Sequence, residues 1–268
     1  MQRLALALFP LLTVAATTLL MSSRPSRMEA PASGVPGKVP VVVELFTSEG
    51  CSSCPSADAA LRELETAQSV AGAEVLALGQ HVDYWNRLGW KDPYSSPAFT
   101  QRQRDYAEGF GAGSYTPQAV VNGQYAFVGS RRQELAETVA KAARAPHATV
   151  RLSRAATGSL SVYVADLPTA KPATVLLALT ETGLSSQVGR GENSGRLLHH
   201  AAVVRELRPL GSVGADGTFV AAVPLKLNAR WKAPNVRAVV LVQETGSRHI
   251  VGVGSLPLRE ATAAAASY

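Results

Sequence analysis

Apolar residues between positions 40 and 82 are spaced first as in a strand, then as in a helix, then as in a strand again. Residues 41–47 form an almost unbroken run of β-branched and apolar side chains, which predicts a buried strand. Apolar residues then recur every three positions, and this spacing predicts an amphipathic helix over residues 55–70. A second buried strand is predicted at residues 74–82. Two strands joined by a helix pair in parallel, so we expect a β-α-β unit here.

The next stretch continues with helices and strands. Residues 97–110 predict a helix that begins at a proline, and Ser130 is expected to cap a further helix. Between these helices, Asn122 and Gly123 separate two short apolar runs and suit the positive-φ turn of a hairpin. The predicted order of elements over residues 39–146 is therefore β-α-β-α-β-β-α.

The pattern changes at about residue 147, after which segments with strand composition replace helices. Turn formers separate these segments, and helical spacing does not return. The segments are residues 148–153, 159–166, 173–181, 197–208, 217–225, 236–245 and 249–257. We expect an α/β domain at 39–146 with a central mixed sheet, followed by an all-β antiparallel, sandwich-like domain at 147–259. Residues 260–268 are Ala-rich and are expected to form a disordered tail.

The N-terminus has the composition of an export signal. Met1-Gln2-Arg3 precedes an apolar run from Leu4 to Met21 without an acidic residue, as in a signal peptide over residues 1–21. A run of this length is also near the lower limit for a membrane span, so an uncleaved N-terminal membrane anchor stays open. Residues 22–38 are rich in Ser, Pro and Ala and predict a flexible linker. The mature protein is expected to be exported, periplasmic or extracellular.

Charge adds one exclusion. The chain of 268 residues carries a formal net charge of +6, but its Lys and Arg residues are scattered, without a basic run interleaved with aromatic residues. This distribution does not fit a nucleic-acid-binding surface. It does not determine an oligomeric state.

The only two cysteines, Cys51 and Cys54, form a CxxC motif between the first predicted strand and the first predicted helix. The positive end of a helix stabilises a thiolate, and a second cysteine one turn away resolves a mixed disulfide. A bridge over so short a loop adds little chain-entropy stabilisation, which favours a redox pair over a structural disulfide. From their positions, Cys51 is the candidate nucleophile, nearer solvent, and Cys54 is the resolving thiol. Asp58 is expected to place its carboxylate at the same helix end.

A metal site finds less support in the sequence. Two thiolates suffice for Cu(I), whereas a structural zinc site takes four ligands, and the chain has no second pair of cysteines. His199 and His200 are adjacent in a predicted strand, so they point to opposite faces and cannot bind one ion together. We expect neither a metal nor a cofactor, with Cu(I) binding by the CxxC as an alternative.

The β-α-β-α-β-β-α order with a CxxC at the first strand–helix junction resembles the thioredoxin fold over about residues 40–145. Tyr115-Thr116-Pro117 strengthens the resemblance, because thioredoxin-like proteins carry a Thr–cis-Pro element that faces the CxxC at this point. The resemblance implies that Thr116 and Pro117 contact the backbone of a substrate. It also implies a Cys51–Cys54 disulfide that alternates with the dithiol.

Longer stretches resemble the DUF1223 family, whose function is not assigned. They are VELFTSEGCSSCPSAD, HVDYWNRLGWKDPYSSPAFTQRQRDYA, YTPQAVVNGQ and, in the second half, RGENSGR at residues 190–196. The resemblance implies a thioredoxin-like domain and a β-rich second domain, without a substrate. The RGENSGR segment either anchors a long crossover or reaches the first domain and shapes a site there.

His81, Asp83 and Trp85 follow the second strand and are candidate substrate-binding residues. They would lie at the rim where open α/β sheets place ligands. In the alternative interpretation, the aromatic residues cover the core and Asp83 pairs locally. Arg102, on the following helix, is expected on a solvated face.

Together these patterns predict an exported thiol–disulfide oxidoreductase that acts on a redox partner protein or a thiol substrate. The alternative is a non-catalytic binding module on a thioredoxin scaffold. In the first case Cys51 and Cys54 carry the chemistry, and in the second the CxxC is vestigial or structural.

Overall fold

The structure is a computed structural model that describes residues 37–155 and 158–258. The predicted signal peptide or anchor at 1–21, nearly all of the 22–38 linker and the 260–268 tail lie outside the described residues. Within the described ranges, no helix is long and apolar enough to cross a membrane.

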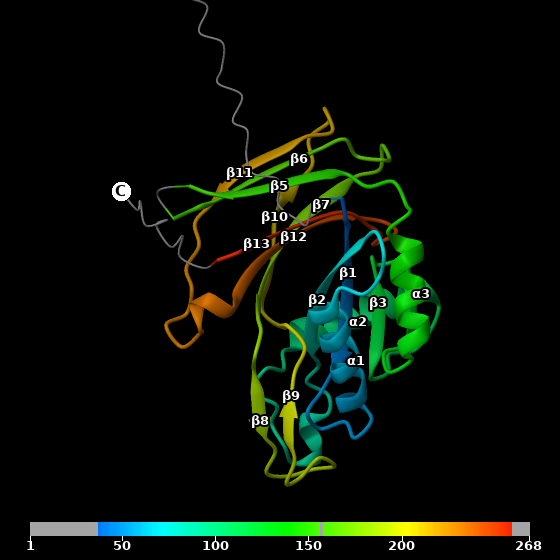
Figure 1. Ribbon diagram of the computed structural model, residues 1–268, viewed down its shortest axis with the longest axis vertical. Coiled ribbons are helices and arrows are strands. Elements are labelled where there is room, and N and C mark those ends of the chain that lie inside the picture. Colours follow the sequence, from blue (N-terminus) through cyan, green and yellow to red (C-terminus); the bar gives the residue numbers. More distant parts are fainter. Residues whose placement is uncertain (1–36, 156–157, 259–268) are drawn as a thin grey trace, which may run out of the picture.

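The first half folds in the order that the apolar spacing predicts (Figure 1). Its elements are β1 (Val39–Thr47), α1 (Cys54–Ala67), β2 (Ala73–His81), the 3₁₀ turn η1 (Asn86–Leu88), α2 (Pro97–Phe110), β3 (Gln118–Val121), β4 (Tyr125–Val128) and α3 (Arg132–Ala142). Asn122 and Gly123 have positive φ angles of 45° and 65°, as expected for the turn between β3 and β4. The predicted Ser130 cap is wrong, because α3 is preceded by Arg131 at its N-cap, without a side-chain capping bond.

Strands occupy the second half, close to the predicted segments. They are β5 (Thr149–Arg154), β6 (Leu160–Ala165), β7 (Ala173–Glu181), β8 (Ser185–Gln187), β9 (Leu197–His199), β10 (Val203–Ser212), β11 (Phe219–Val223), β12 (Val236–Glu244) and β13 (Ile250–Pro257), with the 3₁₀ turn η2 (Ala233–Asn235) before β12. The predicted strand at 197–208 is interrupted at 200–202, and the short strand β8 is absent from the prediction.

Four of the later strands extend the sheet of the first half. The eight-stranded sheet has the order β13-β12-β7-β10-β2-β1-β3-β4, with β1 parallel to β2 and antiparallel to β3. β10 joins in parallel to β2, with Val203 opposite Gly79. The amide of Gly79 donates to the carbonyl of Ala202 at 2.6 Å, and a Cβ on this glycine would lie only 3.2 Å from the same oxygen. The expected separate all-β unit is corrected accordingly, because its main sheet is continuous with the first half.

A second sheet and three helices pack on this sheet (Figure 1). The antiparallel sheet β11-β6-β5 packs on its β7–β12 part through a core that includes Leu152, Leu160 and Leu177. Helices α1 and α3 share a core with Val43 of β1, whereas α2 packs on the side of Val42. The alternation of side chains along β1 produces these two faces. The helices thereby hold the end of β1 beside the start of α1.

A buried ion pair ties α2 to β1. Glu44 is fully buried and accepts hydrogen bonds from Nε and Nη2 of Arg102, at 2.5 and 3.0 Å. Tyr106 donates to the same carboxylate. Burial lowers the pKa of Arg102, but the charge and hydrogen bond of Glu44, together with Tyr106 and Asp105, outweigh burial and raise this pKa. The expected solvated position of Arg102 is therefore wrong, because α2 turns this residue toward the sheet.

Arg102→Met is expected to lower the free energy of unfolding by about 3–5 kcal/mol, since Glu44 would stay buried without its partner. Arg104→Met, on the exposed side of α2, is the matched control and should change stability by less than about 0.5 kcal/mol. Urea unfolding of the disulfide-intact protein measures both variants. Equal stability losses would argue against a structural role for the pair.

Candidate functional site

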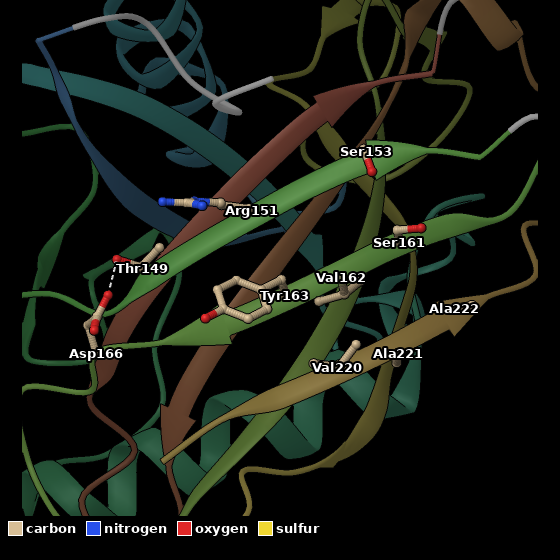
Figure 2. A pocket seen from close by; sticks show the side chains of 10 residues that line it. All are labelled: Thr149, Arg151, Ser153, Ser161, Val162, Tyr163, Asp166, Val220, Ala221 and Ala222. Carbon is tan, nitrogen blue, oxygen red and sulfur yellow. Dashed lines mark hydrogen bonds between the residues drawn. The ribbon is translucent and has the colours of Figure 1, made fainter. Parts of the chain in front are cut away.

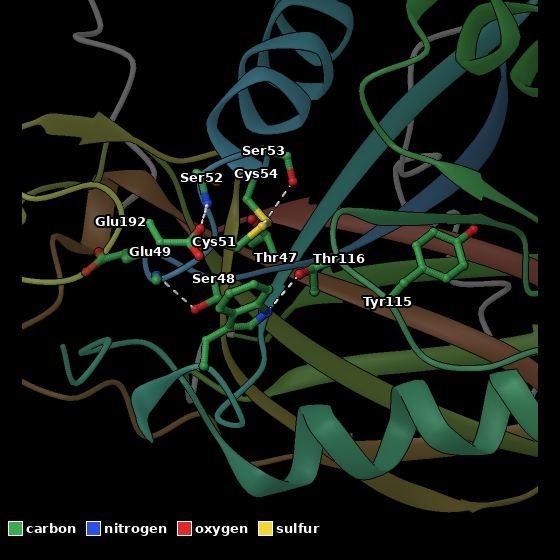
Figure 3. The surroundings of a disulfide bond; sticks show 12 residues. Thr47, Ser48, Glu49, Cys51, Ser52, Ser53, Cys54, Tyr115, Thr116 and Glu192 are labelled. Carbon is green, nitrogen blue, oxygen red and sulfur yellow. Dashed lines mark hydrogen bonds between the residues drawn. A yellow bond between two sulfur atoms is a disulfide. The ribbon is translucent and has the colours of Figure 1, made fainter. Parts of the chain in front are cut away.

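Cys51 and Cys54 form a disulfide between the end of β1 and the start of α1, with sulfur atoms 2.20 Å apart (Figure 3). Cys54 is the first residue of α1, and Pro55 lies in the first turn, as predicted. Both cysteines are 1% exposed, whereas Ser52 and Ser53 between them face solvent. The expectation that Cys51 lies nearer solvent is therefore wrong. Cu(I) binding by this pair would require its reduction.

Trp85 links the disulfide turn to the Thr116–Pro117 peptide. Its indole Nε1 donates to Oγ1 of Thr116 at 2.8 Å. Its Cβ packs so closely on Gly50 that a Cβ on this glycine would lie 3.1 Å away. The Thr116–Pro117 bond is cis and directly precedes β3. Trp85, Thr116 and Pro117 thus meet beside the turn that carries Cys51.

Asp83 is not part of this group. Its carboxylate accepts from Oγ1 of Thr100 at 2.5 Å, and its amide donates to the same hydroxyl at 3.0 Å. These bonds tie the segment after β2 to the first turn of α2. Asp83 therefore pairs locally, which is the second of the two sequence interpretations.

His81 ends β2 and is buried, with 1% of its surface exposed, so it does not line an open rim. Its Nδ1 lies 2.7 Å from Oδ2 of Asp92, and its Nε2 has no hydrogen-bond partner among the described residues. Burial lowers the pKa of His81, but nearby carboxylates, Asp92 foremost, outweigh burial and raise it. Burial raises the pKa of Asp92, but the charge of His81 and the hydrogen bonds from His81, Glu49 and Tyr94 together lower this pKa. His81 therefore faces a buried region of negative charge.

His200 follows β9 and brings a second imidazole to the same place. Its Nε2 lies 3.0 Å from Oε1 of Glu49, and its Nδ1 lies 4.0 Å from Oδ1 of Asp58. The rings of His81 and His200 meet edge to face, with centroids 4.8 Å apart. These four residues and Asp92 are all buried and are called the imidazole–carboxylate cluster below. Asp58 belongs to this interior cluster, although the sequence places it at the helix end.

Three members of the cluster have the chemistry of metal ligands. One potential ligand atom from each of Asp58, His81 and His200 lies within 4.8 Å of the other two. Thr47 lies beside them, since its hydroxyl donates to Oδ2 of Asp58 at 2.7 Å. The cluster begins one helical turn from Cys54, because Asp58 is four positions farther along α1.

The loop at residues 188–196, between β8 and β9, covers the disulfide turn. Asn193 is fully buried. Its Nδ2 donates to the backbone carbonyls of Glu49 and Cys51, each at 2.9 Å. Glu192 is exposed, and its Oε2 accepts from the amide of Ser52 at 2.9 Å (Figure 3). The sequence predicts that the RGENSGR segment either anchors a crossover or reaches the first half of the chain. It does both, because the residues that anchor this loop bind the CxxC turn.

His200, Asp92 and Asn193 are the neighbours of the disulfide region that sequence reasoning missed. His200 and Asn193 lie 151 and 142 positions from their contacts at Glu49 and Cys51. Periodicity carries no information about such distant pairs. The resemblance of the RGENSGR segment to a family hallmark indicates that the segment around Asn193 is important. It does not indicate that this segment contacts the CxxC turn.

Comparison with known proteins covers this whole region. The family model described as "Protein of unknown function (DUF1223)" matches residues 42–243, well over half of the chain. The chain belongs to the DUF1223 family. The match begins in β1 and ends in β12, so the family pattern includes the disulfide, the cluster and the 188–196 loop.

A solved structure is similar to this DUF1223 chain in both halves. It is the crystal structure of protein AGR_C_4864 from Agrobacterium tumefaciens, with a TM-score of 0.68 and 29% sequence identity. The similarity covers 83% of this chain and 96% of that chain. No curated protein matches the sequence.

A separate hollow of about 660 Å³ lies on the outer face of β5, β6 and β11 (Figure 2). Tyr163 and Val220 are exposed there, and the guanidinium of Arg151 lies 6.0 Å from the Tyr163 ring. Figure 1 places this sheet at the opposite end of the molecule from β8 and β9. The hollow is therefore not part of the disulfide site.

Asn193→Ala is expected to speed reduction of the disulfide by dithiothreitol roughly tenfold. The variant removes the donor of two buried carbonyls, and a lost buried hydrogen bond costs about 1–3 kcal/mol, which weakens the cover. Thiol release measures the rate, and circular dichroism verifies the fold. Arg190→Gln, in the same loop but exposed, is the matched control. An unchanged rate in the folded Asn193→Ala protein would mean that the loop does not limit access.

Proposed function

We propose that this protein is an exported thiol–disulfide oxidoreductase with Cys51 and Cys54 as its redox pair. The observation that carries the proposal is the disulfide at the N-terminus of α1. The positive end of a helix stabilises a thiolate and so activates a cysteine in exchange. The substrate is a protein dithiol or a small thiol, and export is inferred from the apolar N-terminal run.

A thioredoxin-like arrangement of the first half is part of this proposal. The order of elements from β1 to α3, the antiparallel pairing of β3 with β1 and the cis Thr116–Pro117 bond before β3 support it. In such an arrangement, the backbone beside the cis proline pairs with an extended substrate. Trp85, which contacts both Thr116 and Gly50, would then line the groove that holds this substrate beside the disulfide turn.

The exchange begins when a substrate thiolate attacks the sulfur of Cys51. A substrate–Cys51 disulfide forms, the Cys51–Cys54 bond breaks, and Cys54 leaves with the electron pair as a thiolate that takes up a proton. A second substrate thiolate then attacks the substrate sulfur and releases Cys51 as a thiolate. The substrate is oxidised by two electrons and the CxxC is reduced, and the reverse sequence reduces a substrate disulfide.

Asp58 is placed to exchange the proton of Cys54. The two residues are four positions apart in α1, so their side chains lie on one face of the helix, one turn apart. Asp58 is 3% exposed, and it lies 4.0 Å from the imidazole of His200. A buried carboxylate next to an imidazole can pass a proton between the thiol and the cluster.

Access to the disulfide depends on the 188–196 loop, because both cysteines are buried beneath it. Glu192 gives this entrance a negative charge, since the hydrogen bonds from Ser52 lower the pKa of its carboxyl. A cationic or neutral thiol is therefore expected to react faster than an anionic one of similar size.

Cys51→Ser is expected to abolish thiol–disulfide exchange, and Cys54→Ser to accumulate mixed disulfides because no resolving thiol remains. Turnover of a small test disulfide measures the first effect, and mass spectrometry of the trapped adduct measures the second. Thr66→Ala, an exposed position near the far end of α1, is the control and should keep its activity. Exchange at the wild-type rate by Cys51→Ser would refute the proposal.

Glu192→Gln is expected to raise the rate of reduction by anionic 2-mercaptoethanesulfonate about fivefold relative to cationic cysteamine. The neutral amide removes the repulsion between the carboxylate of Glu192 and an anionic thiol. The ratio of the two rates is the measurement, and it cancels effects on loop opening. Glu137→Gln, an exposed acid on α3, changes the net charge equally and should leave the ratio unchanged.

A non-catalytic binding module is the second candidate, and the burial of both cysteines favours it. In that case the disulfide only holds the turn between β1 and α1. Alkylation of the reduced protein as a function of pH separates the two candidates. A Cys51 thiol that titrates near about 8.5 and alkylates slowly would favour the binding module, and a strongly lowered value would favour exchange.

A further inference from the structure

His81 and His200 each pair with a carboxylate through one ring nitrogen. Nδ1 of His81 lies 2.7 Å from Asp92, and Nε2 of His200 lies 3.0 Å from Glu49. A carboxylate partner fixes the tautomer of an imidazole and makes its second nitrogen more basic, as in the outer shell of metal-binding histidines. Asp92 is itself held by the amides of Glu49 and Tyr94, each at 2.9 Å, so backbone groups set the orientation of His81.

The second nitrogen of His200 lies near Asp58, and among the described residues the second nitrogen of His81 is unpaired in the same cluster. Nε2 of His81 is buried and has no hydrogen-bond partner among the described residues, and Nδ1 of His200 lies 4.0 Å from Oδ1 of Asp58. One ligand atom of each residue lies within 4.8 Å of the other two. Atoms bound to one zinc ion at about 2.1 Å stand roughly 3.4 Å apart, so ligand atoms as far apart as 4.8 Å need to close by about 1.4 Å.

A small cavity lies beside these ligands. It has a volume of about 10 Å³ and is bordered by Thr47, Asp58 and His200, among others. This volume is close to the minimum that holds one water molecule. It leaves room for an ion or for a water molecule bound to one.

The charge of the cluster also favours a cation. Glu49, Asp58 and Asp92 are carboxylates that are at most 3% exposed. Among the ion pairs of the described residues, they pair only with His81 and His200. With both imidazoles neutral, three negative charges would share a buried site, which is costly unless a cation offsets them.

We propose that Asp58, His81 and His200 bind one zinc ion. Two imidazole nitrogens and one carboxylate oxygen are the three-ligand set of zinc sites that keep a fourth position for water. Asp92 and Glu49 are positioning residues that orient the two imidazoles. The cysteines are not ligands, so zinc binding can be measured without thiol exchange, although Asp58 has a part in both proposals.

The test titrates zinc chloride into the chelator-treated protein with its disulfide intact. Calorimetry should show one equivalent bound, and Co²⁺ should give the visible absorption of a tetrahedral site with nitrogen and oxygen ligands. His81→Gln, His200→Gln and Asp58→Asn should each weaken zinc binding at least about tenfold. Asp92→Asn should weaken it about 10- to 100-fold while the cobalt spectrum keeps its ligand set.

Two control variants make the result specific. His147→Gln changes an exposed histidine outside the cluster and should leave zinc affinity unchanged. The Cys51→Ser/Cys54→Ser protein should also bind with full affinity, which separates this proposal from the redox function. Circular dichroism verifies that each variant folds, and if a ligand variant does not fold, the titration of the wild-type protein decides. Absence of a saturable one-equivalent signal in the wild type, or equal affinity in a folded His81→Gln protein, would overturn the proposal.

Discussion

The approach of β10 to β2 at Gly79 is the contact on which the rest of the site depends. The amide of Gly79 donates to the carbonyl of Ala202. The amide of Ala201, the residue before it, donates to the carboxylate of Asp58 on α1 at 3.4 Å. The segment before β10 is thereby held between β2 and α1, which brings His200 against the end of β2. A side chain at position 79 would meet backbone at 3.2 Å and push this segment away. Glycine usually weakens the interior of a strand. At position 79 it is needed because the backbone before β10 approaches β2 too closely for a side chain.

Two groups of residues enclose the disulfide. On one side, Trp85 connects the turn of Cys51 to the cis Thr116–Pro117 peptide. On the other side lie the 188–196 loop and the imidazole–carboxylate cluster. Glu49 connects the cluster with the loop, since its carboxylate pairs with His200 while its backbone carbonyl accepts from Asn193. Glu49 and Asp58 therefore connect the CxxC turn and the start of α1 to the buried cluster.

Local patterns predicted most of the elements and little of their assembly. Strand and helix positions follow from spacing, and the hairpin at Asn122 follows from the conformations that Asn and Gly tolerate. Arg102 shows the limit of such reasoning, because a charged residue usually faces water and only the buried Glu44 across the interface turns it inward. His200 shows another, because adjacency to His199 in sequence argued against a shared site, whereas its partners come from elsewhere in the chain. The resemblance to a family identified the important segments without their contacts.

The cover of the disulfide is made from residues that leave the ribosome long after the cysteines. Asn193 follows Cys51 by 142 positions, and the pairing of β10 with β2 needs residues later still. During synthesis from the N-terminus onward, the CxxC turn therefore exists for a time without the 188–196 loop and without the second imidazole. Oxidation of the two thiols can take place in that open intermediate. The bond that is later enclosed can thus be formed by an oxidant too large to reach it in the finished protein.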